Sequence, residues 1–517
     1  MQGQIKNILI VGGGTAGWMT ACMLSKRLDD INITLIESSD IPTVGVGEAT
    51  IIQMNFFLRE MGLTENDWMP SCNATYKEGI YFENFYRNGE HYWNPFQPLG
   101  VESTDYWIHK YYKENLSPDS YFDYCFSNTV RNSNNRIDLE TKINQDQIRN
   151  VFYTYHLDAS LFAQHLKAKV ALPGGVKHIV DNVTEVNLAE DGSVSGIETG
   201  ANGTLNADLY VDCSGFRSLL LGDKLGEPFI DYNDRLPNDR AIAIRMPYED
   251  RDKEMHPYTS ATALEAGWVW NIPLWHRIGT GYVYSSQYKS EDDAEFEFRQ
   301  HLGEDRVKDL QAHHIKMRIG KYECPWKKNV VGIGLAGGFV EPLESTGIEL
   351  AQLGAGFLSW YLKKSPTNRA ISQKLYNAKM QSVYDEVSDY IQLHYVLTDR
   401  EDTEYWRDQK YTEADIRTSV LHKLTRRDAS FSFDETGDVF SNTAWNALLI
   451  GMRQIPVHDI FSRSRPIDPN KFAMANKAME DNYRKAKQQA VAVSGGVKNP
   501  THHEYLAKTV YKGIEIE

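Results

Sequence analysis

The chain contains 517 residues, of which 55 are basic and 70 acidic, so its formal net charge is −15. A chain of this length can bury a large core and ordinarily divides into more than one folding unit. The negative charge, without any basic block, argues against nucleic acid and anionic membranes as partners.

Targeting segments and metal sites are also not expected. No apolar run has the length that a membrane-spanning helix needs. The first residues lead directly into a predicted strand, so we expect no signal peptide and a cytoplasmic location. The five cysteines are odd in number and far apart, which fits neither a disulfide framework nor a zinc site.

The N-terminal residues predict a βαβ unit. An apolar run at 5–11 indicates a buried strand, and residues 12–17 read Gly-Gly-Gly-Thr-Ala-Gly. Residues 18–28 carry an apolar helical pattern, and a second predicted strand at 31–36 ends on Glu37. This order of elements is typical of a dinucleotide-binding unit.

The glycine turn has the spacing that such a unit needs. Gly12 permits the tight turn, Gly14 lets the backbone approach a pyrophosphate, and Gly17 allows the helix to pack closely on the strand. Glu37 is placed to bond a ribose hydroxyl. A plain glycine turn is the alternative, but the flanking strand, helix and acid favour dinucleotide binding.

Later segments extend this module. Residues 209–217 form a strand that runs into a glycine turn, as in flavoproteins with two dinucleotide-binding domains, and residues 329–334 predict another strand. Residues 115–150 are polar and predict surface loops, and a helical pattern runs from 348 to about 492. We expect one composite unit over 1–517, with an FAD module from about 1–76, 149–224 and 322–365 and a substrate module from about 77–148, 225–321 and 366–517.

Two short runs are not explained by packing alone. Residues 342–350 read Pro-Leu-Glu-Ser-Thr-Gly-Ile-Glu-Leu and follow a glycine-dense stretch at the start of a predicted helix. The first turn of such a helix can bind an anion, because its backbone N–H groups are unpaired and the helix dipole is positive there. Residues 268–273 read Trp-Val-Trp-Asn-Ile-Pro, which places Trp268 and Trp270 on one side of a strand.

Both runs resemble signatures of the flavin-dependent halogenases, the group that includes the tryptophan halogenases. Strings at 45–50, 155–159, 238–239 and 394–395 are similar to family strings as well. The resemblance implies an α/β fold: a flavin-monooxygenase-like, Rossmann-type FAD module with an interleaved, largely helical substrate region. It implies FAD contacts at Gly12, Gly14, Thr15, Ala16, Gly17, Glu37, Glu48, Ala49, Val183, Leu335 and Ile348.

The resemblance also implies a halide site. In the family, reduced flavin reacts with oxygen to give a C4a-hydroperoxide, which a halide attacks to give hypohalous acid. Thr346 and the amide of Gly347 match the halide-binding positions. The alternative is that the hydroxyls of this run only cap the helix that begins near Ile348.

Two further residues match the family's catalytic pair. Lys77 is implied as the amine that hydrogen-bonds hypohalous acid or becomes a haloamine, and Glu344 as its partner carboxylate. A lysine beside Glu78 is, taken alone, more often a solvated surface charge. Glu344 could instead complement the dipole of the following helix.

Trp268 and Trp270 are interpreted as a wall that keeps the substrate away from the flavin, which favours attack by halide over direct oxygen transfer. The alternative is a core aromatic pair on one strand face. An aromatic hydroxylase is the chief rival function, and a non-catalytic flavin-binding redox protein is a second.

The expected substrate pocket departs from that of the tryptophan-specific members. Residues 440–448 contain neither the tyrosine pair nor the acid that grip the amino-acid end of tryptophan. The string at 94–96 keeps a phenylalanine, Phe96, but has Asn94 where relatives carry histidine. Phe96 and Trp445 are the expected aromatic platforms for the substrate.

We therefore expect an FADH2-dependent halogenase that uses oxygen and chloride, bromide or iodide. Its substrate would be an electron-rich indole or phenol without the amino-acid end. A separate flavin reductase would supply FADH2, because no second nicotinamide-binding fingerprint is present. The number of associated chains is left open, including a homo-oligomer.

Overall fold

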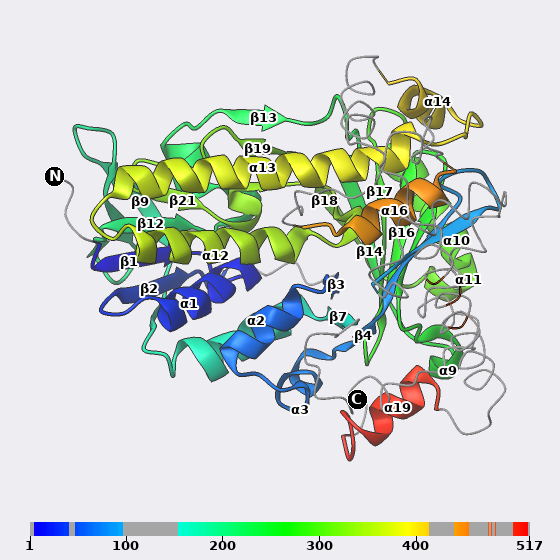
Figure 1. Cartoon of the computed structure of the whole chain (residues 1–517), viewed down its shortest axis with the longest axis horizontal. Coiled ribbons are helices and arrows are strands. Elements are labelled where there is room, and N and C mark those ends of the chain that lie inside the picture. Colours follow the sequence, from blue (N-terminus) through cyan, green and yellow to red (C-terminus); the bar gives the residue numbers. More distant parts are fainter. Residues whose placement is uncertain are drawn as a thin grey trace. The chain divides into compact units, whose positions relative to one another are not determined.

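The computed structural model describes residues 5–40, 47–96, 153–412, 439–453 and 500–514, together with positions 474, 477 and 481 (Figure 1). Its contacts divide the chain into two compact units. The first unit comprises Met1–Asn73, Leu157–Asp239 and Lys316–Ser388, and the second Ala74–His156, Arg240–Ile315 and Asp389–Glu517. In the described part of the chain, no helix is both long and apolar enough to cross a membrane.

The first unit is built on a six-stranded sheet with the order β20-β21-β12-β1-β2-β8. All its neighbouring pairs are parallel except β20 with β21. The strands are β1 (Asn7–Val11), β2 (Asn32–Glu37), β8 (Lys177–Val180), β12 (Leu209–Asp212), β20 (Trp326–Lys327) and β21 (Val330–Gly332). The continuous apolar run of β1 is buried, as expected for a central parallel strand.

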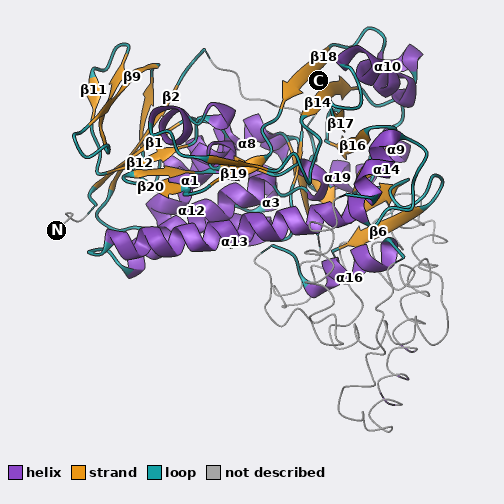
Figure 2. Cartoon of the chain, turned by 90° about the horizontal axis from the view of Figure 1, so that it is seen from above, coloured by secondary structure: helices purple, strands orange, loops and turns teal. Residues whose placement is uncertain are grey.

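The predicted N-terminal βαβ unit is confirmed, with shifts at the element ends. The helix α1 (Thr15–Arg27) begins three residues before the predicted position and lies between β1 and β2 in the chain. Helix α1 packs against α12 (Gly347–Lys364). Figures 1 and 2 show α12 beside α13 (Arg369–Val396), which belongs to the first unit as far as Ser388.

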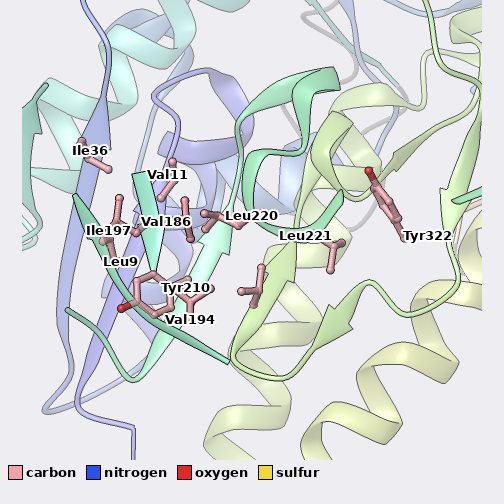
Figure 3. Close-up of a cluster of buried hydrophobic side chains, with 11 residues drawn as sticks. Leu9, Val11, Ile36, Val186, Val194, Ile197, Tyr210, Leu220, Leu221 and Tyr322 are labelled. Carbon is pink, nitrogen blue, oxygen red and sulfur yellow. The ribbon is translucent and has the colours of Figure 1, made fainter. Parts of the chain in front are cut away.

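A second, three-stranded sheet packs on the first. Side chains from β9 (Val183–Leu188) and β10 (Val194–Thr199) meet those of β1, β2 and β12 in one apolar cluster (Figure 3). The cluster contains Leu9, Val11, Ile36, Val186, Val194, Ile197, Tyr210, Leu220, Leu221, Tyr322 and Val330. This core holds the carboxyl ends of the parallel strands in fixed positions.

The remaining elements of the first unit are short. They are β3 (Glu48–Ala49), α2 (Met54–Met61), α3 (Glu65–Trp68), α8 (Ala159–Leu166), β11 (Thr204–Leu205), β13 (Phe229–Asp231), β19 (Gly320–Tyr322) and β22 (Gly338–Phe339). The first unit holds most of the expected FAD stretches and also includes residues 225–239, 316–321 and 366–388, which the sequence places in the substrate module.

The second unit contains a seven-stranded sheet with the order β18-β14-β17-β16-β15-β5-β6, whose strands are orange in Figure 2. The strands are β5 (Gly79–Glu83), β6 (His91–Pro95), β14 (Arg240–Met246), β15 (Thr259–Ala263), β16 (Gly267–Pro273), β17 (Ile278–Tyr284) and β18 (Ala312–Lys316). Strands β4 (Thr75–Lys77) and β7 (Thr154–Leu157) pair separately.

The expectation of a largely helical substrate region is therefore wrong for the described residues. The stretch 240–284 is rich in β-branched and aromatic residues, which fit a pleated, buried surface better than a helix. Helix α10 (Glu291–Leu302) packs against this sheet: its Ala294 and Phe298 lie in one apolar cluster with Ile242, Val269 and Tyr282 of the strands. The other helices that lie wholly in the described part of the second unit are α9 (Arg251–Glu254), α11 (Glu304–Val307), α14 (Glu404–Lys410), α16 (Asn442–Gly451) and α19 (His502–Lys508).

Two predictions fall outside the described residues. The surface loops predicted at 115–150, and the helical pattern predicted at 413–438 and over most of 454–492, lie outside the described residues. Up to residue 412 the predicted helical pattern after residue 348 corresponds to α12, α13 and α14.

The first prediction concerns Gly17. A Cβ there would lie 1.9 Å from the carbonyl oxygen of Gly12, a backbone atom that cannot move aside. Gly17→Ala should therefore lower the free energy of unfolding of the apoprotein by about 1–2 kcal/mol, even after alanine's gain in helix propensity. Urea unfolding measures this.

Gly14→Ala is the matched control. No atom lies within 4 Å of a Cβ at Gly14, and its φ is −73°. Its unfolding free energy should stay within about 0.5 kcal/mol of the wild type. Equal destabilisation of the two variants would contradict the packing role of Gly17.

Candidate active site

The glycine turn lies at the carboxyl end of β1. Gly12 has a φ of +116°, and a Cβ there would lie 2.2 Å from the carbonyl oxygen of Cys213. Helix α1 begins after Gly14, and no side chain caps its first N–H groups. The open backbone at Gly14 and the uncapped helix start fit the pyrophosphate of a dinucleotide.

The other two residues of the turn are positioned by contacts within the first unit. Thr15 donates its hydroxyl to the carbonyl oxygen of Ala159 (3.0 Å). The methyl group of Ala16 lies 2.7 Å from the place that a Cβ on Gly334 would occupy. The backbone after β21 thus comes close to the first turn of α1, which explains a glycine with a φ of +66° at position 334.

Glu37, at the end of β2, lies across this turn. Its Oε1 accepts hydrogen bonds from Lys167 Nζ (2.9 Å) and His178 Nε2 (2.7 Å). Its Oε2 accepts a longer one from Trp18 Nε1 (3.4 Å). A Cβ at Gly13 would lie 1.6 Å from Glu37 Oε2. The acid is thus held over the turn, where it fits a ribose hydroxyl.

The remaining residues assigned to FAD by resemblance also belong to the first unit. Glu48 and Ala49 form β3, and burial together with the charge of Asp158 raises the pKa of Glu48 to about 7. Val183 begins β9 and packs against the core cluster of Figure 3. Leu335 is partly exposed in a short 3₁₀ turn, Gly334–Ala336, and Ile348 is buried in the first turn of α12.

The start of α12 carries a buried hydroxyl that no described residue hydrogen-bonds. Thr346 is the N-cap residue, yet its side chain makes no capping hydrogen bond. The side chain is 0% exposed, and its Oγ1 has no hydrogen-bond partner among the described residues. The alternative that Thr346 serves to cap the helix is therefore wrong. A buried hydroxyl beside the N–H groups of a helix start fits a halide ion.

The chain before α12 is strained and acidic. Ser345 has a φ of +60°, a left-handed conformation that is uncommon for residues other than glycine. Glu344 ends the 3₁₀ turn Pro342–Glu344 and is buried. Strain of this kind is found at functional sites more often than elsewhere.

Glu349 is a buried acid to which we gave no role from the sequence. It lies in the first turn of α12, is 3% exposed, and its Oε1 has no hydrogen-bond partner among the described residues. Burial raises the pKa of Glu349 well above its ordinary value. The only sequence signal is an acid among the small and apolar residues 347–351.

Lys77, in the second unit, is not a surface charge. It ends β4, is 0% exposed, and its partner in the β4–β7 pair is Thr154. Its Nζ lies 5.2 Å from the centroid of the Phe96 ring, which is within cation–π range. The alternative of a solvated lysine is therefore wrong, and two predicted site residues, Lys77 and Phe96, lie together.

A buried histidine supports the strand of Lys77. His156 Nδ1 lies 3.1 Å from Thr75 Oγ1, and its Nε2 lies 2.8 Å from Thr259 Oγ1. Thr75 Oγ1 donates to the carbonyl oxygen of Pro273 (2.5 Å), so His156 must donate from Nδ1. Burial and the charge of Lys77 lower the pKa of His156 well below its ordinary value, so it stays neutral.

Trp268 and Trp270 lie on the same face of β16. Their ring centroids are 6.4 Å apart at an interplanar angle of 60°, and the residues are 2% and 7% exposed. Trp270 pairs with Gly281 on β17, and a Cβ at Gly281 would lie 2.1 Å from the indole ring. The pair is thus fixed, a geometry that agrees both with a wall and with a core pair.

Trp445 lies in a packed aromatic cluster. Tyr390 stacks on Phe440 with centroids 3.8 Å apart and meets Trp445 edge-on at 4.7 Å. Tyr390 donates its hydroxyl to the carbonyl oxygen of Ala444 (2.9 Å) and accepts from Asn94 Nδ2 (3.3 Å). Tyr390, which the sequence interpretation did not single out, therefore links the segment of Asn94 to that of Trp445.

Comparisons with known proteins identify a family for this chain. The sequence model of a family described as tryptophan halogenase matches residues 7–464. A 7-chloro-L-tryptophan 6-halogenase from Kutzneria sp. (strain 744) is 40% identical over 423 residues, covering 78% of this chain and 81% of that protein.

Solved structures agree over almost the full length. A tryptophan halogenase from Shewanella frigidimarina has a TM-score of 0.87 at 30% identity, covering 99% of both chains. A flavin-dependent halogenase from Xanthomonas campestris has a TM-score of 0.83 at 30% identity, covering 98% of both chains. The α/β fold expected from the sequence is confirmed.

The second prediction concerns the pH dependence of stability. Above the ordinary Glu value of about 4.5, the unfolded chain ionises Glu349 while the folded protein keeps its proton, so stability falls as the pH rises. Glu349→Gln removes this loss. Relative to wild type, the unfolding free energy of the variant should rise progressively as the pH increases from 5 to 8.

The measurement is urea unfolding of both apoproteins at several pH values. Glu190→Gln, which changes an exposed acid of the same unit, is the matched control and should leave the pH dependence unchanged. Parallel pH profiles of wild type and Glu349→Gln would contradict the assignment of a buried, neutral acid.

Proposed function

Because the chain belongs to the tryptophan halogenase family, we propose that it halogenates an electron-rich aromatic with reduced FAD, oxygen and a halide. As a flavin-dependent halogenase it is an oxidoreductase that needs a flavin and halide. The observation that carries the residue assignments is the complete burial of Lys77 and Thr346.

The first unit supplies the flavin site of this proposal. The glycine turn and the uncapped start of α1 bind the pyrophosphate, and Glu37 binds the ribose. Leu335 and Ile348 line the isoalloxazine, with Glu48, Ala49 and Val183 as further contacts. When bound, reduced FAD would reduce oxygen to the level of a peroxide, and this oxidant would convert a halide ion into hypohalous acid.

Thr346 and the amide of Gly347 hold the halide. The hydroxyl of Thr346 is already desolvated and makes no hydrogen bond to any residue that the structure describes, so a halide satisfies it without displacing such a partner. The N–H groups at the start of α12 add a partial positive charge. The structure around Thr346 is thus prepared for an anion before one binds.

Lys77 and Glu344 direct the halogen. Lys77 hydrogen-bonds hypohalous acid or is converted to a haloamine, and either form aims an electrophilic halogen at the substrate. Because His156 is neutral, it adds no second positive charge beside Lys77. Glu344 polarises the hypohalous acid or accepts the proton that leaves the aromatic ring.

The second unit selects the substrate. Trp268 and Trp270 keep the aromatic ring away from the flavin, which disfavours direct hydroxylation. Phe96, beside Lys77, and Trp445 provide stacking surfaces. Residues 440–448 contain no acid to pair with an ammonium group, so an uncharged indole or phenol is the substrate class. A separate reductase supplies the reduced flavin.

The third prediction separates halogen transfer from flavin chemistry. Lys77→Ala, and Lys77→Met, which better fills the buried space, should bind FAD and oxidise FADH2 as the wild type does. Formation of halogenated product, measured by mass spectrometry, should fall by about 10²–10³-fold or more.

Lys253→Ala, an exposed lysine of the same unit, is the matched control and should retain activity. Near-normal halogenation by both Lys77 variants would show that Lys77 does not direct the electrophile. A hydroxylated product from the wild type would favour the aromatic hydroxylase.

The fourth prediction tests the halide site. Thr346→Val keeps the shape of the side chain and removes its hydroxyl. The KM for chloride and for bromide should rise about tenfold, the amount expected for one lost hydrogen bond to a charged group. FAD affinity and thermal stability should not fall, because the hydroxyl has no hydrogen-bond partner in the described part of the chain.

Thr199→Val serves as the contrast in the same unit. Its hydroxyl donates to the carbonyl oxygen of Gly203 (2.9 Å), so this change should lower stability without altering the halide KM. If Thr346→Val left the KM of both halides unchanged, the halide would not bind at Thr346.

The fifth prediction concerns the substrate class. Burying the ammonium or carboxylate of tryptophan without a partner costs several kcal/mol, whereas indole avoids this penalty. Indole should therefore show a higher kcat/KM than L-tryptophan in steady-state kinetics at matched halide and FADH2 supply. A clear preference for L-tryptophan would mean that a carboxylate outside residues 440–448 binds its ammonium group.

A further inference from the structure

The carboxylate of Glu37 accepts hydrogen bonds from three side chains, those of Trp18, Lys167 and His178. We call these four residues the Glu37 cluster. The Oε1 atom of Glu37 accepts from Lys167 Nζ at 2.9 Å and from His178 Nε2 at 2.7 Å. The side chains of Glu37, Lys167 and His178 are partly buried, so solvent weakens these hydrogen bonds less than it weakens those of an exposed ion pair.

Each donor comes from a different element of the first unit. Trp18 lies in α1, and His178 lies on β8 opposite Leu35 of β2. Lys167 begins a π-helical turn, Lys167–Ala171, which directly follows α8. Single π-turns are rare and often occur at functional sites. The carboxylate is therefore fixed from three directions.

Rings of the same cluster keep the donors in place. Lys167 Nζ lies 5.4 Å from the centroid of the Trp18 ring, and the rings of Trp18 and His178 are 5.3 Å apart. A lysine held by both a carboxylate and an indole loses little freedom on binding of a further group. The cluster is thus ordered within the protein alone.

This arrangement makes the two oxygens of Glu37 unequal. Lys167 and His178 both donate to Oε1, whereas among the described residues Oε2 accepts only the 3.4 Å hydrogen bond from Trp18, and it lies against Gly13. A carboxylate oxygen can accept about two hydrogen bonds. Oε2 therefore keeps acceptor capacity on the side of the glycine turn.

We propose that Lys167 and His178 are positioning residues that hold Glu37 so that Oε2 accepts from the adenosine ribose of FAD. This inference rests on the proposed flavin site and adds two residues to it, neither of which has been assigned a role above. The two residues determine the affinity of the protein for the adenosine half of the cofactor and do not change its affinity for the flavin half.

The test measures dissociation constants of the apoprotein for FAD, for ADP and for FMN. ADP carries the adenosine ribose without the flavin, and FMN carries the flavin without the adenosine. Lys167→Met and His178→Leu should each weaken FAD and ADP about tenfold, the effect of one poorly placed charge-assisted hydrogen bond. FMN affinity should not change.

Five further variants separate positioning from a structural role. Lys167→Arg and His178→Gln keep a donor and should recover most of the affinity for FAD and ADP. In a Glu37→Gln background, Lys167→Met should cause little further loss, because both changes act on one contact. Lys169→Met and Lys177→Met change exposed neighbours on the same elements and should bind like the wild type.

Other results would overturn the proposal. Equal weakening of FAD, ADP and FMN would show a structural role, and unchanged FAD affinity would show no role in binding. Tighter FAD binding by Lys167→Met would mean that the lysine competes with the ribose for Glu37. If wild-type protein bound no FAD, the proposed function itself would fail, before any variant is compared.

Discussion

The close approach of α1 to the end of β1 is the constraint on which the flavin half of the structure depends. A Cβ at Gly17 would lie 1.9 Å from the carbonyl oxygen of Gly12, so only glycine permits this contact. The contact lets α1 start directly beyond the strand, with its N–H groups uncapped at the edge of the parallel sheet. Glu37, from the neighbouring strand, can then lie across Gly13, and the backbone at Gly334 can approach Ala16. Binding surface arises here from backbone packing more than from side-chain chemistry.

The start of α12 differs from the glycine turn, because it retains buried polar groups to which no described residue forms a hydrogen bond. Thr346 Oγ1 and Glu349 Oε1 are buried without partners among the described residues, and Ser345 holds a left-handed conformation. Such features each destabilise the folded protein by about 1–3 kcal/mol. Proteins keep them where a ligand uses the same groups. A desolvated site for an anion must be built in this way, because any internal partner would compete with the halide.

In the second unit, a neutral, hydrogen-bonded histidine supports the strand that carries Lys77. The bonds of His156 to Thr75 and Thr259 connect β4, β7 and β15 through a neutral ring, and Thr75 reaches the end of β16, which bears the tryptophan pair. Lys77 thus keeps its amine in an aromatic surrounding that includes Phe96. An amine that directs a reactive halogen to one carbon must be held rigidly, because a small displacement of the amine strongly reduces transition-state stabilisation.

The sequence by itself determined the features that depend on neighbours along the chain. The glycine spacing specified the turn at 12–17, and the two-residue period of a strand placed Trp268 and Trp270 on one face. Tertiary structure alone decided the rest. Whether Thr346 caps its helix depends on its backbone angles, and whether Lys77 and Glu349 are buried depends on what packs over them. Lys167 and His178 reach Glu37 across 130 and 141 residues, so no local pattern predicts them. Apart from the strand at 268–273, the strands at 240–284 were not predicted, because buried aromatic runs carry no clear period and only pairing with neighbouring strands fixes their conformation.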